Sequence, residues 1–472
     1  MRRERRARPG VLIIVQNLPV PMDRRVWLEC KALTAAGYHV SVICIAGPSD
    51  PAHELLEGVD IYKYKPAPQA EGTLGFLWEF AYSWTRAAAL SVRVWRRHGF
   101  DVLQACNPPD TYWLLGMLYR LVGKKFVYDQ HDLNPEVFIS RFGEPRGLLQ
   151  TVQYRMLLTL ERLTYRFAHH VISTNESYRT VAMTRGHRAA DEVTVVRSGP
   201  DTSVMRPVAE VAEATSLRNG RRYLACYLGI MGPQDGVDVL LAAIDYYVHI
   251  LGRDDCQFAL LGFGDCLEML QEMSTALELD DYVTFTGRAN PETIARYLSA
   301  ADVGVCPDPM NPLNDVSTMN KTMEYMAFAV PVVAFDLKET RVSAQEAAIY
   351  VHPGDIAGFA TELGDLLDDD DRRAEMAVQA RLRAAADLDW RPQAQAYVGV
   401  YDRLLGFGAA RDGEATVWPA VERRARDAQP LDRDGKRLVD LRNGEELQRF
   451  VRGRRLPDAA DDEAGEPESD GG

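Results

Sequence analysis

Short apolar runs alternate with longer amphipathic stretches along most of the chain. The runs lie at 11–16, 40–46, 101–105, 125–129, 170–173 and 193–197 in the first half, and at 222–228, 257–262, 283–286, 302–306, 331–335 and 348–351 in the second. Near-continuous apolar runs separated by helical stretches are typical of parallel α/β units. Two sets of six strands predict two doubly wound, Rossmann-like parallel-sheet domains that face a cleft, with ligands bound at the carboxyl ends of the strands.

A polar segment rich in Pro, Gly, Ser and Asp, residues 198–220, is predicted to link the two domains. We therefore expect one domain over residues 10–200 and a second over 201–388.

The end of the chain has two parts. In residues 389–407 the apolar positions recur at near-helical spacing, which predicts a helix carrying Trp390, Tyr397, Tyr401 and Leu404. Residues 408–472 form a polar, acidic tail that we expect to be largely disordered, apart from a short helix around 434–452.

Composition bounds the class of protein. The chain has 472 residues, of which 46% are hydrophobic and 26% charged, as in soluble globular proteins. No run of 18 apolar residues and no secretory signal is recognised, so the sequence predicts a cytoplasmic protein without a transmembrane helix. Its cysteines are scattered without a C-x-x-C pair, which predicts reduced core residues at Cys30, Cys44, Cys106, Cys226, Cys256, Cys266 and Cys306.

The net charge of −14 is unevenly distributed. Residues 1–200 contain 26 Lys and Arg against 19 Asp and Glu, a balance of +7, whereas the remainder has a balance of −21. One interpretation is that a basic face meets an anionic partner. The alternative is that solubility sets the acidic half and the basic half is incidental. No nucleic-acid partner is predicted.

Residues 317–336, STMNKTMEYMAFAVPVVAFD, carry the most specific pattern. They predict a helix that begins near Ser317 or Thr318 and ends before Pro331, followed by a strand. Hydroxyls can cap a helix start, and its partial positive charge suits a phosphate. Lys321 and Glu324 share one face, where a cation and a carboxylate can bind a diphosphate and a hydroxylated ring. Alternatively they form an ordinary surface ion pair.

This segment resembles the donor-site helix of family 4 glycosyltransferases, which have the two-domain GT-B fold. The family glutamate that binds the ribose of a nucleotide sugar corresponds to Glu324. A second family glutamate corresponds to Val316, with Asp315 beside it, and a subset of the family carries a serine-lysine-x-x-glutamate form instead. The resemblance covers roughly residues 11–407. In GT-B enzymes the last helix crosses back to the first domain, and residues 389–407 match it.

The resemblance implies an enzyme that transfers a sugar from a nucleotide-diphosphate sugar to a hydroxyl acceptor, with retention of configuration and without a metal or other cofactor. The acceptor would be a cell-surface glycan or polysaccharide precursor on a lipid carrier. Two alternatives remain open: a non-catalytic GT-B partner subunit, and a sugar-nucleotide epimerase.

Two polar stretches of the first half are candidate sites. Asp129, His131 and Asp132 follow a predicted strand, and similar enzymes place a histidine near the transferred sugar at the position of His131. Alternatively, His131 only bonds Asp132 within the loop. In the first βα turn the acceptor-side candidates are Asp23, Arg24 and Arg25. Arginines at a helix start need compensation, either from a phosphate-bearing acceptor or acidic partner, or from water.

The second half departs from the family in the turn at 229–241. Ile230 and Asp235 stand where relatives carry an arginine and a lysine that touch the donor diphosphate. Phosphate binding either moves to Lys321 and Arg288 or is lost. The catalytic candidates are His131, Lys321 and Glu324, and the donor-binding candidates are Gly232, Gly287, Arg288, Asp315, Ser317, Thr318, Met319 and Asn320.

Residues 74–100 combine aromatic and basic side chains: Phe76, Trp78, Phe80, Tyr82, Trp84, Arg86, Arg93, Arg96 and Arg97. Such a helix suits peripheral contact with the inner face of a membrane. Alternatively, it is a core helix with a solvated basic end.

Overall fold

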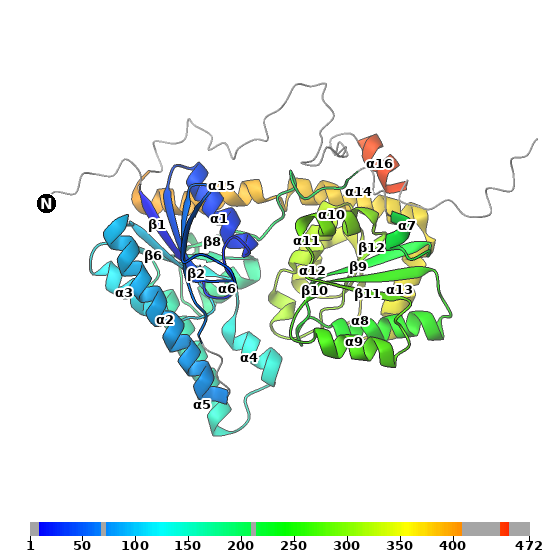
Figure 1. Ribbon diagram of the computed structural model, residues 1–472, viewed down its shortest axis with the longest axis horizontal. Coiled ribbons are helices and arrows are strands. Elements are labelled where there is room, and N and C mark those ends of the chain that lie inside the picture. The colour runs from blue at the N-terminus through cyan, green and yellow to red at the C-terminus, as the bar shows by residue number, and fades with distance from the viewer. Residues whose placement is uncertain (1–8, 68–71, 209–213, 408–443, 453–472) are drawn as a thin grey trace, which may run out of the picture. The chain divides into compact units, whose positions relative to one another are not determined.

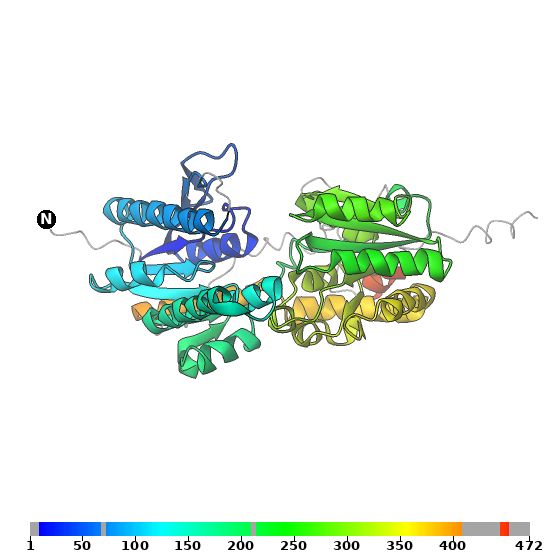
Figure 2. The ribbon, with the colours of Figure 1, turned by 90° about the horizontal axis from the view of Figure 1, so that it is seen from below.

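The computed structural model describes residues 9–67, 72–208, 214–407 and 444–452. These fall into two compact units (Figure 1). Unit 1 comprises the described residues within Met1–Gly199, Asn311–Thr318 and Asp389–Arg424, and unit 2 those within Pro200–Met310, Met319–Leu388 and Ala425–Gly472. Figure 2 shows that helices lie in layers on both sides of the sheet in each unit.

Unit 1 contains an eight-stranded sheet in the order β3-β4-β2-β1-β5-β6-β7-β8. All neighbours are parallel except β3 and β4, which are antiparallel. The strands are β1 (Gly10–Ile14), β2 (His39–Ile45), β3 (His53–Leu56), β4 (Val59–Tyr64), β5 (Val102–Cys106), β6 (Lys125–Gln130), β7 (His170–Ser173) and β8 (Val193–Val195).

Unit 2 contains a six-stranded, all-parallel sheet in the order β11-β10-β9-β12-β13-β14. Its strands are β9 (Tyr223–Ile230), β10 (Cys256–Phe263), β11 (Val283–Gly287), β12 (Val303–Cys306), β13 (Val332–Phe335) and β14 (Ala348–Val351). All twelve predicted strands therefore form, and the sequence missed only β3 and β4.

The helices of unit 1 are α1 (Arg24–Ala35), α2 (Gly72–Arg97), α3 (Trp113–Arg120), α4 (Asn134–Phe142), α5 (Gly147–Phe167), α6 (Glu176–Thr184) and α15 (Trp390–Leu405). Those of unit 2 are α7 (Ala214–Leu217), α8 (Val237–Asp245), α9 (Leu267–Ala276), α10 (Pro291–Ala300), α11 (Asn320–Ala327), α12 (Lys338–Ala344), α13 (Ile356–Asp368), α14 (Asp370–Ala386) and α16 (Gly444–Arg452).

Both sheets are buried on both faces, which explains their continuous apolar runs. In β1, Val11 and Ile13 face one core cluster while Leu12 and Ile14 face another. β9 alternates in the same way between the two clusters of unit 2. Helix α15 packs on unit 1, where the Tyr397 hydroxyl donates a hydrogen bond of 2.6 Å to Gln104 Oε1.

Most of the polar tail lies outside the described residues. Within it, α16 packs against α14, with Leu447 fully buried and Arg452 Nη2 3.4 Å from Asp371 Oδ1. The expectation of a short helix near 434–452 thus holds for α16. All seven cysteines are free, and six are buried. Across the described ranges, no helix combines the length and the apolar character needed to span a membrane.

Candidate active site

A polar network closes the carboxyl end of β6 in unit 1. Asp129 is fully buried, and its Oδ2 lies 2.8 Å from His131 Nε2 and accepts a hydrogen bond of 3.0 Å from Gln104 Nε2. Arg25 Nη2 lies 2.9 Å from Asp129 Oδ1, and Arg25 Nε lies 3.1 Å from Glu29 Oε1. The His131 side chain remains 16% exposed.

The charges of this network shift one another's pKa. Burial acts to raise the pKa of Asp129, but Arg25 and His131 outweigh it and hold that pKa below its ordinary value. Burial acts to lower the pKa of His131, yet Asp129 raises it above the usual range. Burial, assisted by Asp129, raises the pKa of Glu29. The His131 ring is therefore more readily protonated than a free histidine.

Asn107, directly after β5, fixes the backbone that presents His131. Its Oδ1 accepts hydrogen bonds from the His131 N–H at 2.7 Å and the Asp132 N–H at 3.2 Å, and its Nδ2 donates to the Asp132 carbonyl at 2.7 Å. The carboxylate beside the His131 ring belongs to Asp129, two residues earlier, and not to Asp132 as in the alternative from sequence. Burial raises the pKa of Asp132.

In the first βα turn, the partners of Arg25 differ from those predicted. Asp23 caps α1 by accepting a hydrogen bond of 3.1 Å from the Val26 N–H, and Arg24 is exposed. The Arg25 side chain is only 8% exposed and is compensated by Asp129 and Glu29. The predicted sources of compensation, a phosphate-bearing acceptor, an acidic partner or water, are wrong for Arg25, because the chain supplies its own acidic side chains.

Cys106, Asp129 and His131 offer ligand atoms that lie within 4.8 Å of one another. Arg25 contacts both Asp129 and His131, with Nε 3.2 Å from His131 Nε2. Its guanidinium repels a cation at this point, so the group does not fit a resident metal.

In unit 2, Lys321 lies where the strand order reverses, around β9. Its Nζ is 2.5 Å from Asp308 Oδ1 and 5.1 Å from the centre of the Tyr227 ring. Asp308 follows β12, and a Cβ placed on Gly229, near the end of β9, would lie 3.4 Å from Lys321 Cε. Lys321 thus reaches the carboxyl ends of both strands, which is where α/β sheets bind ligands.

Lys321 and Asp308 form a buried ion pair, with side chains 8% and 2% exposed. Burial acts to lower the pKa of Lys321, but Asp308 outweighs it and raises that pKa above its usual range. The second carboxylate oxygen of Asp308 is buried and has no hydrogen-bond partner within the described ranges. Asp308 therefore has one carboxylate oxygen that accepts no hydrogen bond from the described residues.

The start of α11 differs from the prediction. The helix begins at Asn320, and its N-cap residue, Met319, makes no side-chain capping bond. Lys321 and Glu324 are both buried, so the alternative of an ordinary surface pair is wrong. Tyr325 connects helix α11 to β9, because its hydroxyl accepts a hydrogen bond of 2.7 Å from the Leu228 N–H.

The predicted capping hydroxyls have other partners. Residues Asn311–Thr318 group with unit 1. There the Asn175 Nδ2, at the start of α6, donates to the Val316 carbonyl at 2.9 Å and to Thr318 Oγ1 at 3.0 Å, and the Tyr178 hydroxyl lies 2.9 Å from Ser317 Oγ. Asp315 lies in a short 3₁₀ helix of this segment, Asn314–Val316. Ser317 and Thr318 therefore anchor the segment to α6 and do not cap α11.

The turn after β9 is shaped by a hydrogen bond to Asp235 and by Gly236. Asp235 Oδ2 accepts a hydrogen bond of 2.9 Å from the Gly232 N–H, and Ile230 is 51% exposed. Gly236 has φ +69°, and a Cβ there would lie 2.2 Å from the Pro307 carbonyl oxygen, so the turn requires glycine. Asp235 thus shapes this turn.

The remaining donor-binding candidates, Gly287 and Arg288, lie at the carboxyl end of β11, an edge strand of the sheet. Gly287 ends β11 with φ +66°. The Arg288 guanidinium, directly after it, stacks 4.0 Å from the centre of the Phe263 ring at the end of β10. Arg288 is therefore held near the carboxyl ends of β10 and β11.

Several residues of the candidate site were not predicted from the sequence: Glu29, Gln104, Asn107, Asn175, Tyr227 and Asp308. Asn107 and Asp308 each follow a predicted parallel strand, and that placement is the signal that could have found them. The other four lie inside or beside apolar segments, where polar residues have no distinctive pattern.

Two ranges of the chain match descriptions of protein families. Residues 22–199 match the family described as "Glycosyl transferase 4-like domain", and residues 222–369 match "Glycosyl transferases group 1". Together these matches cover well over half of the chain.

Among similar proteins is a 2-deoxystreptamine N-acetyl-D-glucosaminyltransferase of Streptomyces fradiae, 24% identical over 67% of this chain and 74% of its own length. An alpha-D-kanosaminyltransferase of Streptomyces kanamyceticus is 28% identical over 61% and 73%. Similar solved structures include sucrose-phosphate synthase from Thermosynechococcus elongatus (TM-score 0.69, 20% identity, 85% of this chain and 100% of that one). HepE of Anabaena in complex with UDP-glucose has a TM-score of 0.63 (18% identity, 84% and 99%).

Two parallel-sheet units with polar residues gathered at the carboxyl ends of their strands, together with these matches, define the class: the chain is a glycosyltransferase with the GT-B fold. More narrowly, its first part matches a 4-like glycosyltransferase domain and its second part a group 1 glycosyltransferase domain.

Proposed function

We propose that this enzyme transfers a sugar from a nucleotide-diphosphate sugar to a hydroxyl acceptor, with retention of anomeric configuration and without a metal ion. The observation that carries the proposal is the place of Lys321, beside Gly229 and next to a turn that has Ile230 and Asp235 in place of cations. A cation at this edge can neutralise the leaving diphosphate, which is the main electrostatic demand of the reaction.

The donor would bind to unit 2 through helix α11. The sequence at the start of this helix would be the serine-threonine-x-asparagine-lysine-x-x-glutamate form of the donor-site motif. Lys321 and Arg288 would supply positive charge to the diphosphate, and the backbone at Gly232 and Gly287 would approach it closely. Glu324, one turn after Lys321, would accept hydrogen bonds from the ribose hydroxyls. Met319 and Asn320 would contact the donor at the start of α11.

The segment before α11 would have a positioning role. The bonds from Asn175 and Tyr178 hold Ser317 and Thr318, and Asp315 lies in the same segment. We assign this segment to setting the path of the chain into α11, since its hydroxyls already have protein partners.

In unit 1, His131 would orient the transferred sugar. The bond between the anomeric carbon and the diphosphate oxygen breaks, a bond to the acceptor oxygen forms, and the acceptor proton leaves with the nucleoside diphosphate. Asp129 keeps the imidazole positively polarised, which suits a position near developing negative charge. Asp23, Arg24 and Asp132 lie around the same strand ends and are the acceptor-side candidates that remain, while Arg25 holds the network together.

The sequence left open two functions from other classes. Ile230 and Asp235 favour a non-catalytic partner subunit, which would not bind nucleotide sugars. A sugar-nucleotide epimerase would convert its substrate without an acceptor. A thermal-shift screen of nucleotide sugars tests the first, because a ligand stabilises the folded state by mass action. Release of nucleoside diphosphate only when an acceptor is present separates a transferase from an epimerase.

The acceptor is proposed to be a lipid-linked precursor of a cell-surface glycan or polysaccharide, reached from the cytoplasmic face of a membrane. On α2, Ala87 and Val94 pack into the core, while its basic residues are exposed at Arg86, Arg93, Arg96 and Arg97.

The turn between α4 and α5 adds a second feature. Phe142, Leu148 and Leu149 are 63%, 83% and 67% exposed. Exposed apolar and basic side chains on amphipathic helices suit an anionic membrane surface.

A further inference from the structure

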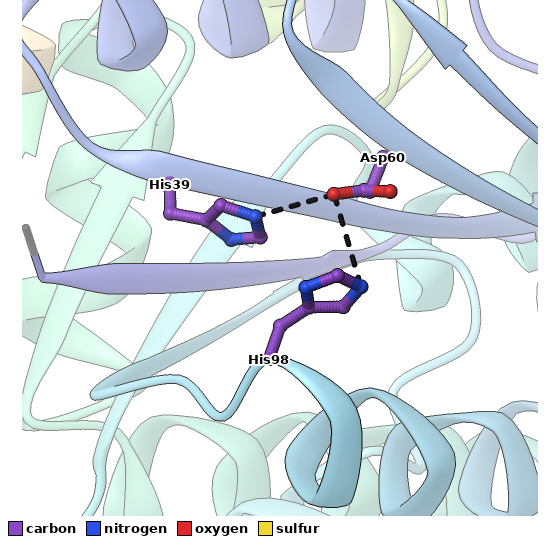
Figure 3. Close-up of side chains that lie close together, drawn as sticks. All are labelled: His39, Asp60 and His98. Atoms are coloured by element: carbon purple, nitrogen blue, oxygen red, sulfur yellow. Dashed lines mark ion pairs between the residues drawn. The ribbon is translucent and has the colours of Figure 1, made fainter. Parts of the chain in front are cut away.

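Three histidines surround one carboxylate in unit 1. Asp60 Oδ2 lies 3.2 Å from His39 Nε2 and 3.9 Å from His98 Nε2, and Asp60 Oδ1 lies 3.0 Å from His53 Nε2. The rings of His39 and His98 stack with centres 4.9 Å apart. Figure 3 shows both rings beside the Asp60 carboxylate, with one nitrogen of each directed at the same oxygen.

The cluster lies at the opposite edge of the sheet from the candidate active site. His39 opens β2, Asp60 is the second residue of β4, and His98 directly follows α2. β2 and β4 are parallel neighbours, with Ser41 opposite Asp60. The amino ends of parallel strands lie at one edge and their carboxyl ends at the other, so His131, after β6, is remote from this cluster.

The separations suit a metal ion. Tetrahedral zinc binds imidazole nitrogens and carboxylate oxygens at about 2.0–2.2 Å, which places neighbouring ligand atoms roughly 3.3–3.5 Å apart. One ligand atom from each of His39, Asp60 and His98 lies within 4.8 Å of the others, and the two separations to Asp60 Oδ2 bracket the zinc value.

We propose that His39, Asp60 and His98 bind a divalent transition-metal ion of the Zn²⁺ type, with a water molecule in the fourth position. Two imidazoles and one carboxylate favour such ions, whereas Mg²⁺ and Ca²⁺ require sets of oxygen ligands. His53 holds the second oxygen of Asp60 and so orients the carboxylate, as residues behind metal ligands commonly do.

One existing hydrogen bond competes with the metal ion. The Tyr62 hydroxyl lies 2.9 Å from His98 Nε2, and this hydrogen bond is given up when a metal binds. An ion bound there joins the end of α2 to β2 and β4.

The test uses the full chain, stripped with a chelator and titrated with ZnCl₂ by calorimetry, with thermal unfolding in parallel. We expect one ion per chain bound with a rise in Tm, and at least a tenfold increase in Kd in the double variant His39→Ala/His98→Ala. Asp60→Asn, which keeps the shape of the side chain, should weaken binding similarly, and it replaces the double variant if that fails to fold. MgCl₂ should have no effect.

His352→Ala is the matched control, because this histidine is exposed in unit 2 and should leave zinc binding unchanged. Binding by the wild type that persists in both His39→Ala/His98→Ala and Asp60→Asn would overturn the proposal, because the ion would then bind elsewhere on the chain. A wild-type chain that binds no zinc would overturn it as well.

Discussion

At the scale of single residues, the buried pair of Lys321 and Asp308 has a structural role and a proposed chemical one, and the two can be separated. Removing one partner of a buried pair leaves the other charge without compensation and costs about 3–5 kcal/mol, whereas removing both costs much less. Lys321→Ala should therefore lower the free energy of unfolding by this amount in a urea titration. The double variant Lys321→Ala/Asp308→Ala should recover most of it. A double variant as unstable as the single one would show that the pair is not the source of the loss.

The network around Asp129 predicts how stability depends on pH. The raised pKa of His131 means that its contribution is complete below about pH 6.5, the ordinary histidine value, and is lost as pH rises through the pKa of the folded state. The raised pKa of Glu29 acts in the same direction, because its buried carboxyl must ionise. The free energy of unfolding should thus fall as pH rises from about 4.5, the ordinary value for Glu29, and more steeply from about 6.5, where His131 also begins to lose its contribution.

His131→Gln removes one of the two groups, so its stability should fall less steeply over the same pH range. Urea titrations at a series of pH values measure both slopes. Identical slopes in the wild type and in His131→Gln would mean that the imidazole does not gain a proton on folding.

At the scale of elements, the docking of α11 on β12 depends on one glycine. A Cβ on Gly304 would lie 2.4 Å from the Tyr325 ring, and Tyr325 is the fully buried residue that supports α11. Gly304→Ala should destabilise the fold by roughly 1–3 kcal/mol through overpacking and should weaken nucleotide binding by displacing α11.

Gly399→Ala provides the control for this substitution. Gly399 lies inside α15, where a Cβ meets only Arg403 Nη1, at 3.5 Å. Alanine is the better helix former, so this variant should be stabilised by up to about 1 kcal/mol. Equal destabilisation by Gly304→Ala and Gly399→Ala, measured by thermal unfolding, would argue against a specific contact at Tyr325.

The apolar pattern predicted elements better than it predicted contacts. Runs buried on both faces identify twelve strands, because parallel strands of this kind are apolar throughout. The hairpin of β3 and β4 was missed, because β3 has only four residues and its side chains alternate between exposed and half-buried. Its two-residue turn, Glu57 and Gly58, has positive φ at both residues and resembles the tight hairpin turns that glycine favours.

Site residues were predictable where they follow strands, and less so where their partners come from distant segments. His131 and Lys321 were found from local patterns. Nothing local indicates that Arg25 would pair with Asp129, more than a hundred residues away, or that Ser317 would contact Tyr178. The pairing depends on tertiary packing, which the spacing of residues does not encode.

At the scale of the whole molecule, the basic first half predicts salt-sensitive attachment to anionic vesicles. Each basic residue near such a surface contributes about 1 kcal/mol, so replacing Arg93, Arg96 and Arg97 with glutamine should weaken attachment on the order of a hundredfold at low salt. The matched control replaces the same three residues with lysine, which keeps the charge and should keep the attachment. Sedimentation with phosphatidylserine vesicles measures both. A wild-type chain that ignores these vesicles at low salt would make a soluble acceptor the better hypothesis.

The central claim is that unit 2 binds a nucleotide-diphosphate sugar around Lys321. Calorimetric titration of nucleoside diphosphates and their sugars into the wild type and into Lys321→Ala/Asp308→Ala tests it most directly, because the double variant removes the cation without leaving a buried charge. We predict that the wild type binds at least one nucleotide and that the double variant loses about 1.5–3 kcal/mol of binding free energy, the value of one charge-assisted contact. Equal affinity in both proteins, or no nucleotide binding by the wild type, would contradict the claim.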